Sequence, residues 1–150
     1  MLKLSRLTDY AVVVLARMGT APDARRSAPD LAARTGLSEP TVAKVLKILA
    51  GSGLVVGLRG ARGGYLLARP LAEIALSEVI TAFDGPIALT ACVDGGTGCC
   101  ESGALCGMRG RWDPVNNAIR NALSGITIAD LAAPPPVAFI PEAAIRLAAQ

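Results

Sequence analysis

The sequence predicts a mainly helical fold with a small β-wing, in the order helix, helix, turn, helix, hairpin that is typical of a winged helix-turn-helix. Two observations carry this prediction. Apolar residues recur at helical spacing in segments of the first fifty residues. A glycine-rich turn, residues 59–64, then joins two short runs of strand-forming residues.

The first helix is predicted over Leu4–Met18, because Leu7, Val14 and Leu15 recur at helical spacing. Thr8 or Asp9 lies near its start, where a short polar side chain can cap a helix. Gly19 ends it.

A second, short helix is predicted over Ala28–Thr35 and a third from Ser38 to about Ala50. Ser38 is a favourable N-cap residue. Pro40 is tolerated in a first turn, since its missing N–H would be unpaired there. The third helix carries a buried stripe of four residues: Val42, Val45, Leu46 and Leu49.

The rest of the chain is predicted to add two strands, three helical segments and a cysteine loop. In chain order they are strands 54–58 and 65–68, a helix over 77–83, the loop over about 86–107, a helix over 109–123 and a short element over 126–131. We expect three parts: a winged helix-turn-helix over 1–70, a cysteine-bearing part over 71–131, and a tail over 132–150.

Charge is distributed unevenly along the 150 residues. Residues 1–69 hold eleven lysines and arginines against four acids, a net +7, whereas residues 70–150 carry a net −4. A basic half indicates a polyanionic partner. No apolar run is long enough to span a membrane, so we expect a cytoplasmic protein.

The basic half has the features of a double-stranded DNA reader. A recognition helix needs small or polar residues in its first turns, and a wing needs cations on a slim hairpin that fits the minor groove. The alternative is that the lysines form an ordinary solvated surface and that the hairpin only reverses the direction of the chain. The predicted DNA contacts are Ser38, Pro40, Thr41, Lys44, Lys47, Arg59 and Arg62, with Lys3 and Arg6 as further phosphate contacts. An enzyme is disfavoured, because the chain has no histidine and no phosphate loop or nucleophile elbow.

All four cysteines lie in one glycine-rich stretch: Cys92, Cys99, Cys100 and Cys106. In the cytoplasm such clusters are more often metal ligands or redox groups than structural disulfides. Zinc is disfavoured, because no Cys-x-x-Cys pair occurs. An iron–sulfur cluster suits thiolates on a flexible loop. Zinc, a disulfide and the absence of any ligand remain alternatives on spacing alone.

The chain resembles the IscR/NsrR/RirA-type family of bacterial iron–sulfur transcription regulators. The resemblance runs from Met1 to about Leu131. It rests on residues 4–11, 53–55 and 59–67, on the cysteine loop, and on Trp112 six residues after the last cysteine. Residues 7–16 and 39–47 are most similar to regulators of the SUF iron–sulfur assembly operon.

This resemblance implies a homodimer on a palindromic operator, with the helix over 109–123 crossing its partner. It implies cluster ligands at Cys92, Cys106 and one middle cysteine. Cys100 is favoured over Cys99, because it keeps the six-residue step to Cys106. The nuclearity, two-iron or four-iron, stays open.

The fourth ligand also stays open. One branch of the family uses a histidine at the position that is Arg109 here. In another branch an aspartate of the first helix reaches the partner's cluster, and this residue corresponds to Asp9. Asp9 is alternatively a helix cap, and Cys99 is the competing ligand. We therefore expect a cluster-sensing repressor of iron–sulfur assembly genes. The alternatives are a nitric-oxide- or redox-sensing regulator of the same fold, and a zinc-binding interaction protein.

Overall fold

The computed structural model describes residues 3–60, 63–93, 106–108 and 110–133. Its elements, in chain order, are α1 (Arg6–Gly19), α2 (Ala28–Thr35), α3 (Glu39–Gly51), β1 (Val55–Leu58), β2 (Gly64–Leu67), the 3₁₀ turn η1 (Leu71–Glu73), α4 (Leu76–Asp84), α5 (Asp113–Ser124) and α6 (Ile128–Ala132). This mainly helical arrangement with a two-stranded antiparallel wing confirms the predicted fold class.

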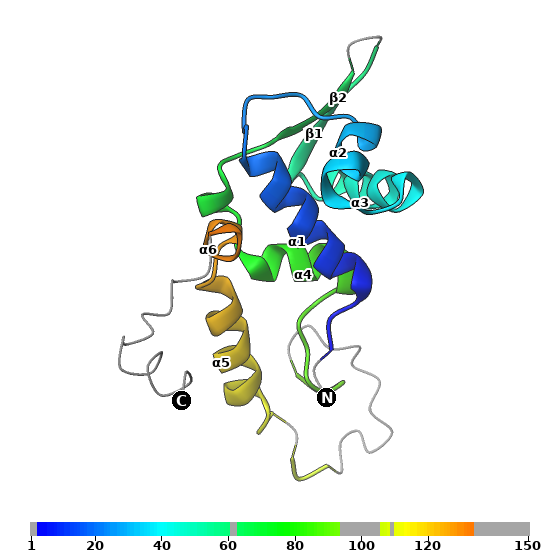
Figure 1. Cartoon of the computed structure of the whole chain (residues 1–150). Helices are drawn as coiled ribbons and strands as arrows, with labels where there is room; N and C mark the ends of the chain where they lie inside the picture. The colour runs from blue at the N-terminus through cyan, green and yellow to red at the C-terminus, as the bar shows by residue number, and fades with distance from the viewer. Residues whose placement is uncertain (1–2, 61–62, 94–105, 109, 134–150) are drawn as a thin grey trace, which may run out of the picture.

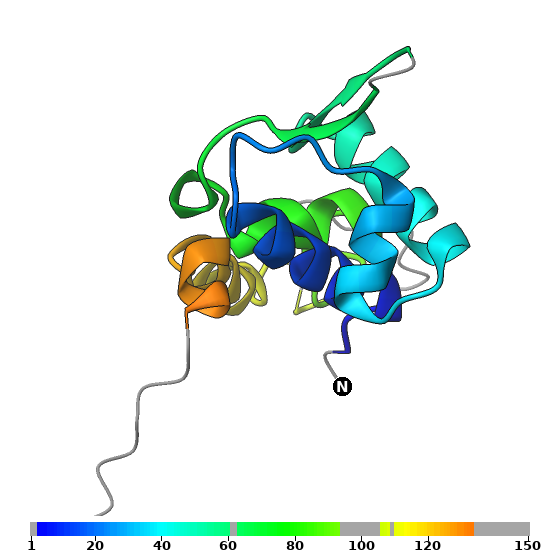
Figure 2. The same ribbon diagram turned by 45° about the horizontal axis from the view of Figure 1, so that its top comes forward.

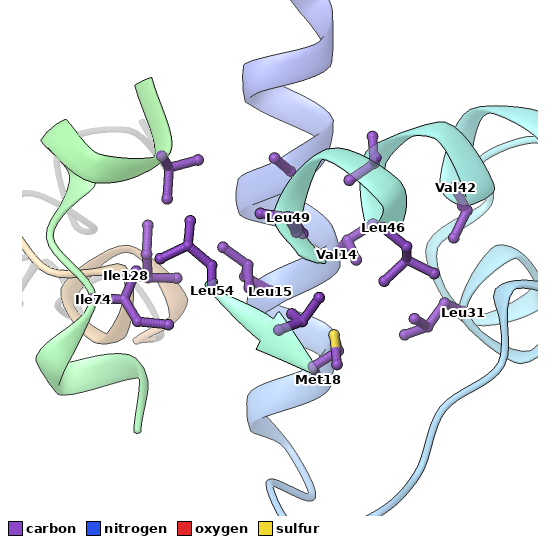
Figure 3. Close-up of a cluster of buried hydrophobic side chains, with 14 residues drawn as sticks. Val14, Leu15, Met18, Leu31, Val42, Leu46, Leu49, Leu54, Ile74 and Ile128 are labelled. Atoms are coloured by element: carbon purple, nitrogen blue, oxygen red, sulfur yellow. The ribbon is translucent and has the colours of Figure 1, made fainter. Parts of the chain in front are cut away.

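The core is built from apolar side chains of α1, α2, α3, α4 and α6 and of the segments around β1 and η1. Figure 3 shows Val14, Leu15 and Met18 of α1 at its centre, with Leu46 and Leu49 of α3 on one side and Ile74 and Ile128 on the other. The predicted stripe of α3, Val42, Val45, Leu46 and Leu49, is completely buried. Ile128 is also fully buried, which fixes α6 against α1.

The wing projects from the helical body beside α3 (Figures 1 and 2). Val55 pairs with Leu67 and Leu58 with Gly64. A side chain at Gly63 would place its Cβ 2.6 Å from the carbonyl oxygen of Leu58, so this turn requires glycine.

The loop before α2 contributes an unexpected third strand-like contact to the wing. The Arg26 N–H donates to the Tyr65 carbonyl at 3.0 Å, and the Tyr65 N–H donates to the Arg26 carbonyl at 2.8 Å. This bridge joins the start of β2, next to the hairpin turn, to the residue before the N-cap of α2. The sequence indicated only a loop there, because the partners lie far apart along the chain.

Helix α5 starts at Asp113, four residues later than predicted. Gly110 adopts φ +76°, which interrupts helical geometry, and Pro114 suits a first turn. Arg109 lies outside the described residues. In Figure 1, α5 runs away from the helical body, and it packs against α4.

Candidate nucleic-acid interface and cysteine site

The predicted recognition residues lie on the solvent side of α3. Ser38, Pro40, Lys44 and Lys47 are exposed and Thr41 is half-buried, since the opposite face of the helix is in the core. The exposed carboxylate of Glu39 sits among them at the first position of α3. Sequence reasoning missed Glu39, although its place between Ser38 and Pro40 was the available signal.

Ser38 occupies the N-cap position but does not cap the helix with its side chain. Its hydroxyl lies 2.8 Å from the Thr41 hydroxyl instead, and the two form a hydrogen bond. The prediction that Ser38 is the N-cap residue of α3 is confirmed, although its side chain accepts no hydrogen bond from the helix. No side chain among the described residues caps the first turn of α3, and Ser38, Glu39 and Pro40 at its start are exposed, as a phosphate-binding helix end requires.

The wing places Arg59 at the end of β1, exposed and followed by Gly60 at φ +102°. The Gly63 N–H donates to the Gly60 carbonyl at 2.8 Å, which closes the turn. Arg62, the second predicted wing arginine, lies outside the described residues.

Part of the positive charge of the N-terminal half is neutralised internally. Asp30 accepts from Arg34 at 2.7 Å and from Arg26 at 3.2 Å. The hydrogen bond from the Arg34 guanidinium, against an opposing effect of burial, holds the pKa of Asp30 below its ordinary value. Arg69 pairs with Glu78. Within the described residues, Lys44, Lys47 and Arg59 take part in no ion pair, so their charges remain available to a polyanion.

The segment that carries Cys92 leaves the C-terminal end of α4 and is held at several points. Asp84, the last residue of α4, accepts from the buried Thr8 hydroxyl at 2.7 Å and from the Ser5 N–H at 3.1 Å. Burial raises the pKa of Asp84, but the hydrogen bonds from Thr8 and Ser5 outweigh it and lower that pKa. This network joins the start of α1 to the start of the cysteine-bearing segment.

Further along, the segment docks on α5. The Leu89 N–H donates to the side-chain oxygen of Asn116 at 3.0 Å, and the Asn116 amide donates to the Ile87 carbonyl at 3.2 Å. Beyond this contact the Val93 N–H bonds the Thr90 carbonyl, and the Val93 side chain is buried. Asn116 and Thr90 had no signal in the sequence, because both act through contacts that composition and periodicity do not encode.

Cys92 and Cys106 are free, half-buried thiols. The Cys92 sulfur lies 3.3 Å from the Thr90 hydroxyl. Cys99 and Cys100 lie outside the described residues. Among the residues that are described, no group of three or more cysteine or carboxylate side chains is placed to hold a metal ion.

Asp9 does not cap α1, because Ser5 does so by accepting from the Thr8 N–H at 3.2 Å. The carboxylate of Asp9 lies in the first turn, exposed to solvent, and makes no hydrogen bond or ion pair within the part of the chain that the structure describes. Of the two alternatives for Asp9, helix capping is therefore wrong.

No helix among the described residues is long and apolar enough to cross a membrane.

The N-terminal end of helix α5 and the residues just before it present apolar side chains to solvent. Trp112 at its N-cap is 41% exposed and Val115 is 45% exposed, and Met108, just before it, is 50% exposed.

Comparisons with known proteins agree with this architecture. The family model described as Rrf2, iron-dependent transcriptional regulator, matches residues 4–134. Among curated proteins, a putative HTH-type transcriptional regulator, ORF2 of Azotobacter vinelandii, is 33% identical over 133 residues, covering 88% of this chain and 80% of that protein. The HTH-type transcriptional regulator IscR of Cronobacter sakazakii is 33% identical over 102 residues, covering 68% of this chain and 62% of that protein.

Solved structures extend the likeness to the fold. CymR, the global cysteine regulator of B. subtilis, superimposes with a TM-score of 0.68 at 26% identity, covering 88% of this chain and 97% of that one. IscR of T. potens gives a TM-score of 0.60 at 28% identity, covering 87% and 85%. The chain thus belongs to the Rrf2 family and is a DNA-binding transcriptional regulator with a winged helix-turn-helix, not an enzyme.

Proposed function

We propose that this regulator senses an iron–sulfur cluster and represses genes of iron–sulfur cluster assembly. The observation that carries the proposal is that Cys92 and Cys106 are free, half-buried thiols, and that the segment leading to Cys92 is held to α1 through Asp84 and to α5 through Leu89. IscR, a relative at 33% identity, belongs to a family described as iron-dependent.

The donor set suits such a cluster, two-iron or four-iron. Thiolates are the usual ligands of iron–sulfur clusters, and we assign Cys92, Cys106 and Cys100 to this role. Either Asp9 of the partner subunit or Cys99 completes the set. Asp9 is available, because Ser5 caps α1 in its place and the carboxylate is exposed. When bound, the cluster supplies a centre whose presence or oxidation state follows iron and oxidant supply.

Thr90 provides a hydrogen-bond partner for the sulfur of Cys92. A thiolate has no proton to give, so in the ligated form the Thr90 hydroxyl is the donor in the contact with Cys92. Hydrogen bonds to ligand sulfurs are among the features that set the reduction potential of a cluster.

The DNA contacts proposed are those of α3 and the wing. Ser38, Pro40, Thr41 and Lys44 face the major groove, Lys47 contacts phosphate, and Arg59 and Arg62 enter the minor groove. The exposure of the α3 residues and the projection of the wing support this arrangement. Residues 1–70 form the DNA-binding part, 71–131 the cluster and dimerisation part, and 132–150 a tail.

Dimerisation through α5 is part of the proposal. Trp112 and Val115 expose apolar surface that a second copy would cover, and paired heads would read a palindromic operator. Each of these two residues keeps more than two fifths of its surface exposed.

Anaerobic purification tests the function. A brown protein with stoichiometric iron and sulfide, whose colour is lost in Cys92→Ala, is the expected result. Unchanged cluster content and stability in Asp9→Ala would exclude Asp9 as a ligand. Titration with nitric oxide and with peroxide, while DNA binding is followed, identifies the signal. A colourless protein that holds zinc would overturn the proposal in favour of a zinc-binding interaction protein.

A further inference from the structure

Asn116 is the one fully buried residue of α5, and it is polar. Burying a primary amide in place of an apolar side chain is unfavourable unless both of its polar ends find partners. Both ends do so, and both partners belong to the backbone of the cysteine-bearing segment, at Ile87 and Leu89. The adjacent Asn117 is exposed, so burial is specific to one of two neighbouring, chemically identical side chains.

The contact is placed so that it controls Cys92. Leu89, which donates to Asn116, is followed directly by Thr90, whose hydroxyl touches the Cys92 sulfur and whose carbonyl accepts from Val93. The turn that carries the thiol therefore begins at the hydrogen bond to α5. If this turn moves, its hydrogen bonds to Asn116 are strained. If α5 moves, the same hydrogen bonds displace the turn.

The other end of α5 continues toward the wing. The Ser124 hydroxyl donates to the Ser77 hydroxyl of α4 at 2.9 Å, and Glu78, one residue further along α4, pairs with Arg69 beyond β2. Three polar contacts thus connect the Cys92 turn to the base of the wing: Leu89 with Asn116 of α5, Ser124 of α5 with Ser77 of α4, and Glu78 of α4 with Arg69.

We infer that Asn116 is a positioning residue that latches the Cys92 turn onto α5 and thereby couples the state of the cysteine site to the DNA-binding head. This inference rests on the proposed function. Coupling between two sites is measured as the ratio of DNA affinities with the first site occupied and empty, and it is lost when the connecting contact is lost.

The latch itself is tested on the cluster-free chain by amide hydrogen exchange. In the wild type the Leu89 amide is protected. In Asn116→Ala its exchange rises about tenfold or more, because a buried N–H loses its acceptor. Asn117→Ala is the matched control and leaves it unchanged. Asn116→Asp, which has the same shape, keeps an acceptor for Leu89 but loses the donor to Ile87, so it shows an intermediate rise and serves if the alanine variant does not fold.

The coupling is tested on anaerobically purified holo-protein. The ratio of operator affinities between cluster-loaded and cluster-free protein falls toward one in Asn116→Ala and stays at the wild-type value in Asn117→Ala, while the cluster-free affinity is the same in both. Unchanged Leu89 exchange, or lost protection with an unchanged affinity ratio, overturns the inference. A colourless wild type overturns the proposed function and the coupling together, whereas a brown wild type with an unchanged ratio in Asn116→Ala overturns the coupling alone.

Discussion

Replacing Thr8 with valine removes one hydroxyl from the junction between α1 and the end of α4 while keeping the shape of the side chain. Thr8 is completely buried, and its hydroxyl donates to Asp84 over 2.7 Å. Hydrogen bonds to charged groups contribute about 1.5–3 kcal/mol. Asp84 is exposed enough for water to replace part of this, so we expect a loss of about 1–2 kcal/mol in the free energy of unfolding at neutral pH.

The same variant carries a pH signature. The hydrogen bonds from Thr8 and Ser5 outweigh burial and lower the pKa of Asp84 below 3.8, so the ionised carboxylate is stabilised in the folded state. This stability is present above the unfolded pKa and disappears as the pH falls through the lower, folded pKa. The difference between the wild type and Thr8→Val should therefore be largest at neutral pH and shrink once Asp84 is protonated.

Urea unfolding followed by circular dichroism, in neutral and acidic buffers, measures both quantities. Thr8→Ser keeps the hydroxyl and should retain the bond. Thr81→Val removes an exposed hydroxyl of α4 that bonds only the Ser77 carbonyl, and we expect a change within about 0.5 kcal/mol. A Thr8→Val loss that is equal at both pH values, or no larger than that of Thr81→Val, would refute the reasoning.

Three further predictions concern the wing, the recognition surface and the core. Gly63→Ala should distort the wing and weaken operator binding in a gel-shift assay, because its Cβ would lie 2.6 Å from the Leu58 carbonyl oxygen. In the control variant Gly57→Ala, the new Cβ makes only an ordinary 3.5 Å contact with Tyr65, so this variant should bind the operator normally. Arg59→Ala should lower affinity mainly for operators with A/T-rich minor grooves, and Lys47→Ala should lower it for all sequences and reduce the salt slope by about one; unchanged affinity at matched salt removes either residue from the interface. Leu46→Ala should cost about 2–5 kcal/mol in chemical unfolding, since this side chain is fully buried, and a cost below that of an exposed substitution would show that it is not in the core.

Elements with a strong local pattern were predictable from the sequence. The bounds of α2 agree with the prediction, and the four-residue stripe of α3 is the buried one, because hydrophobic spacing alone decides which side of a helix is covered. The glycine turn of the wing was predictable for a related reason: Gly60 needs a positive φ and Gly63 needs space.

Contacts between distant polar groups were not predictable. The two bonds of Asn116 span 27 and 29 residues, and nothing in the neighbourhood of Asn116 in the sequence separates it from the exposed Asn117. The Arg26–Tyr65 bridge and the Thr8–Asp84 bond have the same character. The capping alternative for Asp9 failed for a local reason, because another short polar residue near the start of α1, Ser5, is the cap.

The central claim is that the cysteine site governs DNA binding. The most direct test is one anaerobic sample whose absorption spectrum, iron and sulfide content and operator affinity are measured before and after the iron is removed by a chelator. We expect a brown protein containing iron and sulfide whose operator affinity changes when the colour is lost. A protein without iron and sulfide, or an operator affinity that is the same with and without them, would contradict it.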